Sequence, residues 1–99
     1  MLMVYVTHPD MACARRISRI LLKENLCACA VMFPVKSMYS WKGKFKYSNE
    51  MVTLLKTVKK NRERLLSRVQ ELHPYEIPAI IVLDARANAK YEHWIGGMR

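Results

Sequence analysis

Hydrophobic and polar residues alternate along the middle of the chain. From residue 31 to residue 47 the odd positions are mainly apolar or aromatic, and the even positions are mainly polar. A period of two is typical of strands with one buried face. Lys42-Gly43 provides a tight turn because glycine accepts a positive φ, and Pro34 requires an edge strand or a bulge. We therefore predict a long hairpin with one apolar face containing Val31, Phe33, Val35, Tyr39, Trp41, Phe45 and Tyr47.

Apolar runs on either side of this pattern predict the rest of a sheet. Residues 2–6 are β-branched, aromatic and apolar, and they stop at a proline-containing turn. Residues 51–58 are apolar on both faces, as expected of a central strand or of one that reaches into a neighbour. Residues 77–83 form a last compact apolar run with Pro78 near its start.

Three segments have the spacing of helices. Apolar residues recur at helical intervals over residues 11–25 and 61–72, and His73-Pro74 ends the second run because residues before proline avoid helical angles. Residues 88–95 suit a short closing helix. The resulting order, β-α-β-β-α-β plus a terminal helix, predicts one α+β domain over residues 1–99. Its fold would be a ferredoxin-like sandwich with both main helices on one face of an antiparallel sheet.

The predicted hairpin is too long for a domain of this size. Its apolar face would remain partly in water unless another subunit covered it, so the alternation itself favours association. We expect Tyr39, Trp41 and Phe45 to be buried at contacts between subunits.

The chain is strongly basic, but its charge is evenly spread. Residues 1–50 have eight basic and three acidic residues, net +5, and residues 51–99 have nine and five, net +4. This distribution shows no basic arm and raises non-specific attraction to anions more than it identifies a ligand. No apolar run reaches the roughly 18 residues of a membrane span, and the apolar start is too short for a signal peptide. Cys13, Cys27 and Cys29 form an odd set without a CxxC motif, so we expect reduced thiols and a cytoplasmic location.

The sequence supports neither catalysis nor specific nucleic-acid recognition. No motif for an activated nucleophile, a catalytic metal or a phosphate loop is present, so we predict that the chain is not an enzyme. RNA-recognition modules share the element order, but they stack bases on aromatic residues of the central strands. Here those strands offer only Tyr5, so a specific nucleic-acid site is not expected. Sequence-blind contact through the basic surface remains the alternative function.

Six motifs occur in order along nearly the whole chain, and together they resemble the CutA family of divalent-cation-tolerance proteins. This resemblance implies a ferredoxin-like subunit and a PII-like homotrimer in which the long hairpins pair between subunits. It also implies a small binding or scaffold protein that responds to divalent ions such as copper. The motifs are Thr7-x-Pro9-Asp10, Leu26-x-Ala28-Cys29, Ser37-x-Tyr39-x-Trp41-x-Gly43-Lys44, Glu50 with Lys56-Thr57, His73-Pro74-Tyr75-Glu76-x-Pro78, and Tyr91-x-x-Trp94-Ile95.

The resemblance also indicates candidate site residues. Copper-binding members are expected to have a cysteine and a histidine where this chain has Val6 and Leu72, so His73 alone keeps a ligand position of the family. Cys29 is a second, separate metal candidate. The alternatives are a hydrogen-bonded helix terminator for His73 and a packed thiol for Cys29. No cofactor is required, and a copper ion is the metal considered. A second group of polar and aromatic residues is expected to join His73, either in a ligand cleft or packed at a subunit interface. Its members are Glu50, Tyr75, Glu76, Tyr91 and Trp94. Instead of binding a ligand, Glu50 would form an ion pair with Lys44 or Lys56. Cys13, on the first helix, is expected to act only as a small hydrophobic residue.

Overall fold

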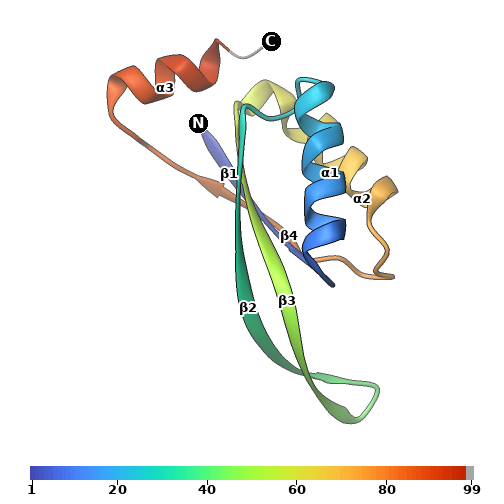
Figure 1. Ribbon diagram of the computed structural model, residues 1–99. Coiled ribbons are helices and arrows are strands. Elements are labelled where there is room, and N and C mark those ends of the chain that lie inside the picture. Colours follow the sequence, from blue (N-terminus) through green and yellow to red (C-terminus); the bar gives the residue numbers. More distant parts are fainter. Residues whose placement is uncertain (98–99) are drawn as a thin grey trace.

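The predicted order of elements is confirmed. The computed structural model describes residues 1–97 and contains four strands, three α-helices and one short 3-10 turn within them (Figure 1). The elements are β1 (Leu2–His8), α1 (Met11–Lys23), β2 (Cys29–Trp41), β3 (Lys44–Thr57), the 3-10 turn η1 (Lys59–Asn61), α2 (Arg62–Leu72), β4 (Ile80–Asp84) and α3 (Ala89–Gly96).

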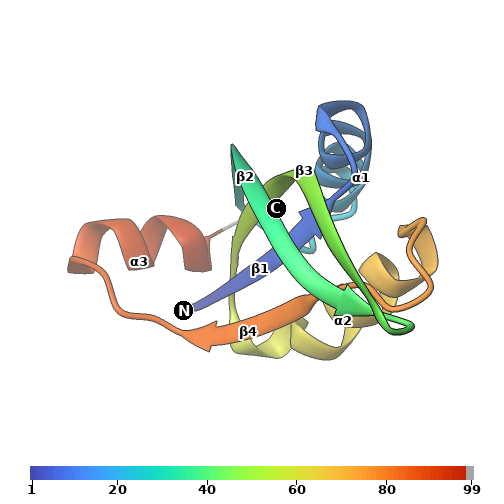
Figure 2. The same ribbon diagram turned by 90° about the horizontal axis from the view of Figure 1, so that it is seen from below.

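The four strands form one antiparallel sheet in the order β2-β3-β1-β4. Helices α1 and α2 cover one face, called here the helix face, and α3 lies on the opposite side, called the open face (Figure 2). Pro34 lies in edge strand β2, as its missing N–H requires. Within residues 1–97 no helix has the length and hydropathy that crossing a membrane requires.

The core lies between the helix face and the two main helices. Asp10 starts α1, because its carboxylate accepts a hydrogen bond from the Cys13 backbone N–H at 2.8 Å. The apolar stripe of α1 then packs against β1, β3 and α2. The buried cluster consists of Val4, Val6, Cys13, Ile17, Leu21, Leu26, Cys27, Leu55, Leu65 and Val69.

Strands β2 and β3 continue far beyond their neighbours. Strand β1 reaches only Met51 on β3, whereas the β2–β3 ladder continues to the pair Trp41–Lys44. Residues 35–50 therefore form a two-stranded projection, the hairpin extension, which Figure 1 shows leaving the body of the subunit. Its turn, Lys42-Gly43, has φ of 50° and 78°, the paired positive values of a tight two-residue hairpin turn.

The prediction of a single apolar face on this hairpin is wrong. Paired residues share a face, and a two-residue turn pairs odd positions of β2 with even positions of β3. Tyr39 pairs with Lys46 and Trp41 with Lys44, whereas Phe45 pairs with Ser40 and Tyr47 with Met38. Tyr39 and Trp41 therefore lie on the open face, and Phe45 and Tyr47 lie on the helix face. Both faces of the extension are partly apolar.

Other differences concern the ends of elements. The first helix ends at Lys23 rather than at residue 25, because Asn25 has a φ of 58° that no helix continues. The last strand begins at Ile80 rather than at residue 77, and Ile77 is exposed in the segment before it. These shifts leave the topology unchanged.

Candidate functional site

The largest cleft near the predicted ligand residues lies on the open face and runs along the hairpin extension from its base toward its tip. It has a volume of about 750 Å³, within the range of clefts that hold small ligands. We call it the open-face cleft. It brings together the predicted Glu50, Tyr75 and Glu76 with two hairpin aromatics, and its lining is Thr7, Ser37, Met38, Tyr39, Trp41, Lys46, Glu50, Tyr75, Glu76, Ile77 and Ala79.

Glu50 and Tyr75 form the polar centre of this cleft. The Tyr75 hydroxyl donates a hydrogen bond of 2.5 Å to Glu50 Oε2, and both side chains are partly buried. Burial raises the pKa of Tyr75, and the hydrogen bond to the Glu50 carboxylate raises it further, so the phenol stays protonated. The partner of Glu50 is thus a tyrosine and not Lys44 or Lys56, which corrects the predicted ion pair.

Replacing Tyr75 with phenylalanine is expected to lower the free energy of unfolding by about 1–2 kcal/mol, because Glu50 loses a charge-assisted hydrogen bond in a partly buried position. Urea unfolding at fixed protein concentration measures this change in the free energy of unfolding. Tyr5→Phe, which removes a tyrosine hydroxyl from β1, is the control and should change stability by less than about 0.5 kcal/mol. Equal effects of the two substitutions would contradict the importance of the Tyr75–Glu50 bond.

His73 is the C-cap of α2, and both of its ring nitrogens are engaged. Nε2 donates to the Thr7 carbonyl oxygen at 2.7 Å, and Nδ1 accepts from the Tyr75 backbone N–H at 3.1 Å. Burial lowers the pKa of His73, which keeps the ring in the neutral form that these two bonds need. This is the geometry of a hydrogen-bonded helix terminator. A metal could bind His73 only if one of the two bonds were released.

The second metal candidate, Cys29, lies elsewhere in the subunit. It pairs with Lys56, which in turn pairs with Met3 near the start of β1, whereas His73 contacts Thr7 near the end of that strand. The chain therefore does not bring the two candidates together. In the described part of the chain, no three histidine, cysteine, aspartate or glutamate side chains are grouped for a metal ion.

Tyr91 and Trp94 lie on α3, away from the open-face cleft. Lys56 Nζ donates to the Tyr91 hydroxyl at 2.9 Å and lies 5.0 Å from the centre of that ring. The Tyr91 and Trp94 rings stack at 5.9 Å. Because Lys56 is at the Cys29 end of the β2–β3 ladder, these aromatics are separated from Glu50 and Tyr75 within one chain. One subunit thus divides the predicted group between two places.

Sequence reasoning missed a buried polar contact under α1. His8 is fully buried on the helix face, with Nε2 at 3.0 Å from Thr53 Oγ1 and Nδ1 at 3.6 Å from Cys13 Sγ. Its ring also stacks on His73, with centroids 5.2 Å apart. Burial, followed by the electrostatic interaction with His73, lowers the pKa of His8 to about 4. The signal was present in the sequence, because position 8 has the same parity as the buried positions 2, 4 and 6.

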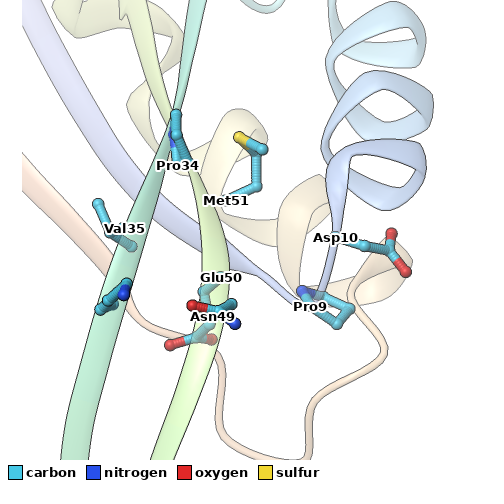
Figure 3. Close-up of a pocket in the computed structure, with 8 residues that line it drawn as sticks. Pro9, Asp10, Pro34, Val35, Asn49, Glu50 and Met51 are labelled. Atoms are coloured by element: carbon cyan, nitrogen blue, oxygen red, sulfur yellow. The ribbon is translucent and has the colours of Figure 1, made fainter.

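Cys13 was predicted to be only a small hydrophobic residue, but it has His8 as a polar neighbour. Burial raises the pKa of its thiol, so Cys13 and His8 form a neutral pair and not an activated thiolate. A second cleft, of about 490 Å³, opens between the start of α1 and the hairpin (Figure 3). It is lined by Pro9, Asp10, Pro34, Val35, Lys36, Asn49, Glu50 and Met51.

Comparison with known proteins agrees with this fold. Residues 2–97 match the family model described as CutA1 divalent ion tolerance protein. The divalent-cation tolerance protein CutA of Pyrococcus horikoshii is 41% identical, over 96% of this chain and 94% of its own. The crystal structure of CutA1 from that organism superposes with a TM-score of 0.92, at 40% identity and with 96% and 94% of the two chains covered.

Two further solved structures are similar. The PII-like protein CutA from Nostoc has a TM-score of 0.91 at 35% identity, covering 99% of this chain and 96% of its own. The CutA protein from Archaeoglobus fulgidus, described as periplasmic, has a TM-score of 0.92 at 31% identity, covering 96% and 95%. These relatives are named as tolerance proteins or PII-like proteins and not as enzymes, in agreement with the prediction that the chain is not an enzyme. Full-length similarity in both sequence and structure leads to one conclusion: the chain belongs to the CutA1 family of divalent ion tolerance proteins.

Proposed function

We propose that the protein is a homotrimeric binding protein that contributes to tolerance of divalent cations such as copper. The main support is the exposure of large side chains on both faces of the hairpin extension. On the helix face Met38, Phe45 and Tyr47 are 70%, 87% and 66% exposed, and on the open face Tyr39 is 46% exposed. A soluble subunit that presents such a surface has a binding partner for it.

The arrangement of these residues favours a closed ring over a two-fold dimer. A two-fold dimer uses the same patch on both subunits, whereas a ring joins two different patches of each subunit. The extension has two different apolar faces, one with Tyr39 and Trp41 and the other with Phe45 and Tyr47. A ring of three buries both faces against sister subunits, and the family resemblance implies the same number.

The open-face cleft is the proposed ligand site of this trimer. It runs along the open face of the extension, so a neighbouring subunit that covers the hairpin also closes the cleft. Glu50 and Glu76 supply carboxylate oxygens, which suit hard divalent ions. Tyr91 and Trp94 would join them only from a second subunit. His73 and Cys29 are the softer donors that copper favours. His73 would take part only after it loses a hydrogen bond, and Cys29 would take part only from another subunit.

Native mass spectrometry of protein purified without chelator tests the assembly, with an expected mass of three 11.6 kDa chains. Equilibrium dialysis against copper, zinc and nucleotides then tests the cleft. We expect uptake of a divalent ion that decreases in Glu50→Gln, whereas Lys90→Gln, an exposed change on α3, serves as control. A single chain at micromolar concentration would contradict the trimer. Failure of all three ligand classes to bind would contradict the site.

We also propose a cytoplasmic location, since all three cysteines are free and none is placed in a disulfide. The Archaeoglobus fulgidus relative is described as periplasmic, so location needs its own experiment. Fractionation of the source cells should recover the protein with cytoplasmic markers, and recovery in an exported fraction would contradict this proposal.

A further inference from the structure

The basic residues of helix α1 are not used by the proposed function. This helix has four basic residues and no acidic one, whereas α2 has three basic and two acidic residues. Arg15, Arg19 and Lys23 are exposed and follow one another at intervals of four residues. Residues with this spacing lie one above the other on a helix, about 6 Å apart along its axis. They form a straight row of positive charge, called here the α1 row.

The α1 row faces away from the sheet. The buried side of the helix contains Cys13, Ile17 and Leu21, which belong to the core. Arg19 lies on the opposite side of the helix from Ile17, because two residues apart are about 200° apart around a helix. Figure 2 shows α1 on the side of the sheet opposite to α3. The proposed subunit contact uses the hairpin extension and the open-face cleft, so it does not include this row.

The carboxylates around the helices have other partners. Glu24, which follows α1, pairs with Arg68 at 2.8 Å, and the two acidic residues of α2 pair with arginines of their own helix. Within residues 1–97, no carboxylate forms an ion pair with a member of the α1 row. Like charges four residues apart repel each other and weaken a helix. The row therefore does not stabilise the subunit, and a negatively charged partner would relieve the repulsion.

Arg16 adds a fourth positive charge beside the row. Its guanidinium donates a hydrogen bond of 3.2 Å to the carbonyl oxygen of Leu72, the last residue of α2. Carbonyl groups at the end of a helix have no partner within that helix, so this bond satisfies one of them. Arg16 thus joins the two helices and holds its charge next to the row.

The side chains of α1 favour a partner that is recognised by charge alone. Helices that bind membrane surfaces insert apolar and aromatic residues, and single-stranded nucleic acids stack their bases on aromatic rings. Helix α1 has no aromatic residue, and its large exposed apolar residues, Met11 and Leu22, lie at opposite ends. Protein interfaces also depend on aromatic or other large anchors. None of these three partners fits a surface that presents mainly cations.

Duplex DNA fits such a surface best. It has one negative charge for about every 1.7 Å of its axis, so a row of about 12 Å meets roughly seven charges. Contacts from arginine and lysine to phosphate hold a protein on a duplex but do not read the bases. We propose that the α1 row docks on the phosphate backbone of duplex DNA independently of its sequence. This docking surface is separate from the open-face cleft and requires no metal ion.

Fluorescence anisotropy with labelled duplexes of two unrelated sequences, in the presence of a chelator, tests the docking surface. We expect the two duplexes to bind equally and to bind more weakly as salt increases. Three phosphate contacts account for a loss of about 40-fold between 50 and 200 mM salt. Arg15→Gln/Arg19→Gln/Lys23→Gln should make the slope of log K against log salt shallower by about 2.7 for each row in contact with the duplex.

A matched variant separates the row from the overall charge of the protein. Lys59→Gln/Arg86→Gln/Lys90→Gln removes the same number of charges from exposed residues outside α1 and should retain the wild-type slope. Glutamine has nearly the helix propensity of arginine and lysine, and circular dichroism of each variant checks that it is folded. If both variants lost the same affinity, attraction to the overall charge would explain binding and the α1 row would be overturned.

Other partners give different results in the same assay. Vesicles containing phosphatidylserine test a membrane, polyglutamate tests an acidic protein, and a single strand of the same length tests recognition of unpaired bases. We expect the duplex to bind most tightly of the four. Tighter binding to any of the other three, no binding to the duplex at 50 mM salt, or a preference of more than about tenfold for one duplex sequence would overturn the proposal.

Discussion

Replacing Trp41 with alanine is expected to make the proposed trimer dissociate into subunits. Trp41 lies on the open face near the tip of the hairpin extension, opposite Lys44. If the assembly buries this ring fully, its removal costs about 3–5 kcal/mol per site, as for other buried tryptophans. Sedimentation velocity over a range of concentrations should show species lighter than those of the wild type, and the melting temperature should be lower than that of the wild type at the same protein concentration.

The opposite face of the extension provides a second, independent test. Phe45→Ala should weaken the assembly as well, because Phe45 points away from Trp41 and is 87% exposed in the single chain. Ser40→Ala, which changes a small polar residue on the same projection, is the matched control and should leave the sedimentation profile unchanged. Trp41→Ala protein that sediments and melts like the wild type would refute the assignment of this hairpin to a subunit contact.

Acid is expected to destabilise the protein through His8. The pKa of this ring is lowered from 6.5 to about 4 in the folded chain, so below pH 6.5 the unfolded chain binds a proton that the folded chain does not. The contribution of His8 is fully present above pH 6.5 and is lost as the pH falls toward 4. Between pH 7 and pH 5 the loss should be about 2 kcal/mol. Burial has the largest effect on this pKa; among the titratable neighbours, His73 and Arg16 lower it and Glu50 and Asp10 raise it.

Urea unfolding at several pH values, with a chelator and at one protein concentration, measures this slope. His8→Gln should flatten the dependence between pH 7 and pH 5 even if the variant is less stable overall, because the titrating group is gone. His93→Gln removes an exposed histidine from α3 and should retain the wild-type slope. A slope that is the same in wild type and His8→Gln would show that His8 is not the group responsible.

Local patterns were sufficient for the topology of this subunit. The helical spacing of Ile17, Leu21, Leu65 and Val69 reflects one buried stripe on each helix, and these four residues are in the core. The turn at Lys42-Gly43 follows from a local preference for positive φ. Each of these features depends on neighbours close in sequence, so the amino-acid pattern is enough to predict it.

The faces of the hairpin could not be predicted in the same way. Alternation within one strand is a local property, but the relation between two strands depends on the number of residues in the turn. With two residues in the turn, Tyr39 and Phe45 point in opposite directions although both are odd. Because of this register, the hairpin extension has two apolar faces and not the one that was expected. Two apolar faces favour contacts with subunits on both sides of the extension.

The candidate sites were also predicted only in part from the sequence. Motif resemblance identified Glu50, Tyr75 and His73, and the structure places the three near one another through the Tyr75 hydrogen bonds. The motif resemblance did not identify His8 and Cys13 as partners, because they come from different elements and neither residue belongs to a motif for metal binding. The resemblance also grouped Tyr91 with Glu50, whereas in one chain α3 packs on Lys56 at another part of the sheet.

The amino-acid sequence by itself determined the order of elements, the tight turn, the long hairpin and the family, since periodicity and motifs depend on residues that are close in sequence. Tertiary structure alone decided which side chains meet. The strand register set the two faces of the extension, and the packing of α1 on β1 brought a thiol to a buried imidazole. The physical reason is that hydrogen bonds, donor distances and pKa shifts depend on separations in space, which the spacing of residues along the chain does not specify.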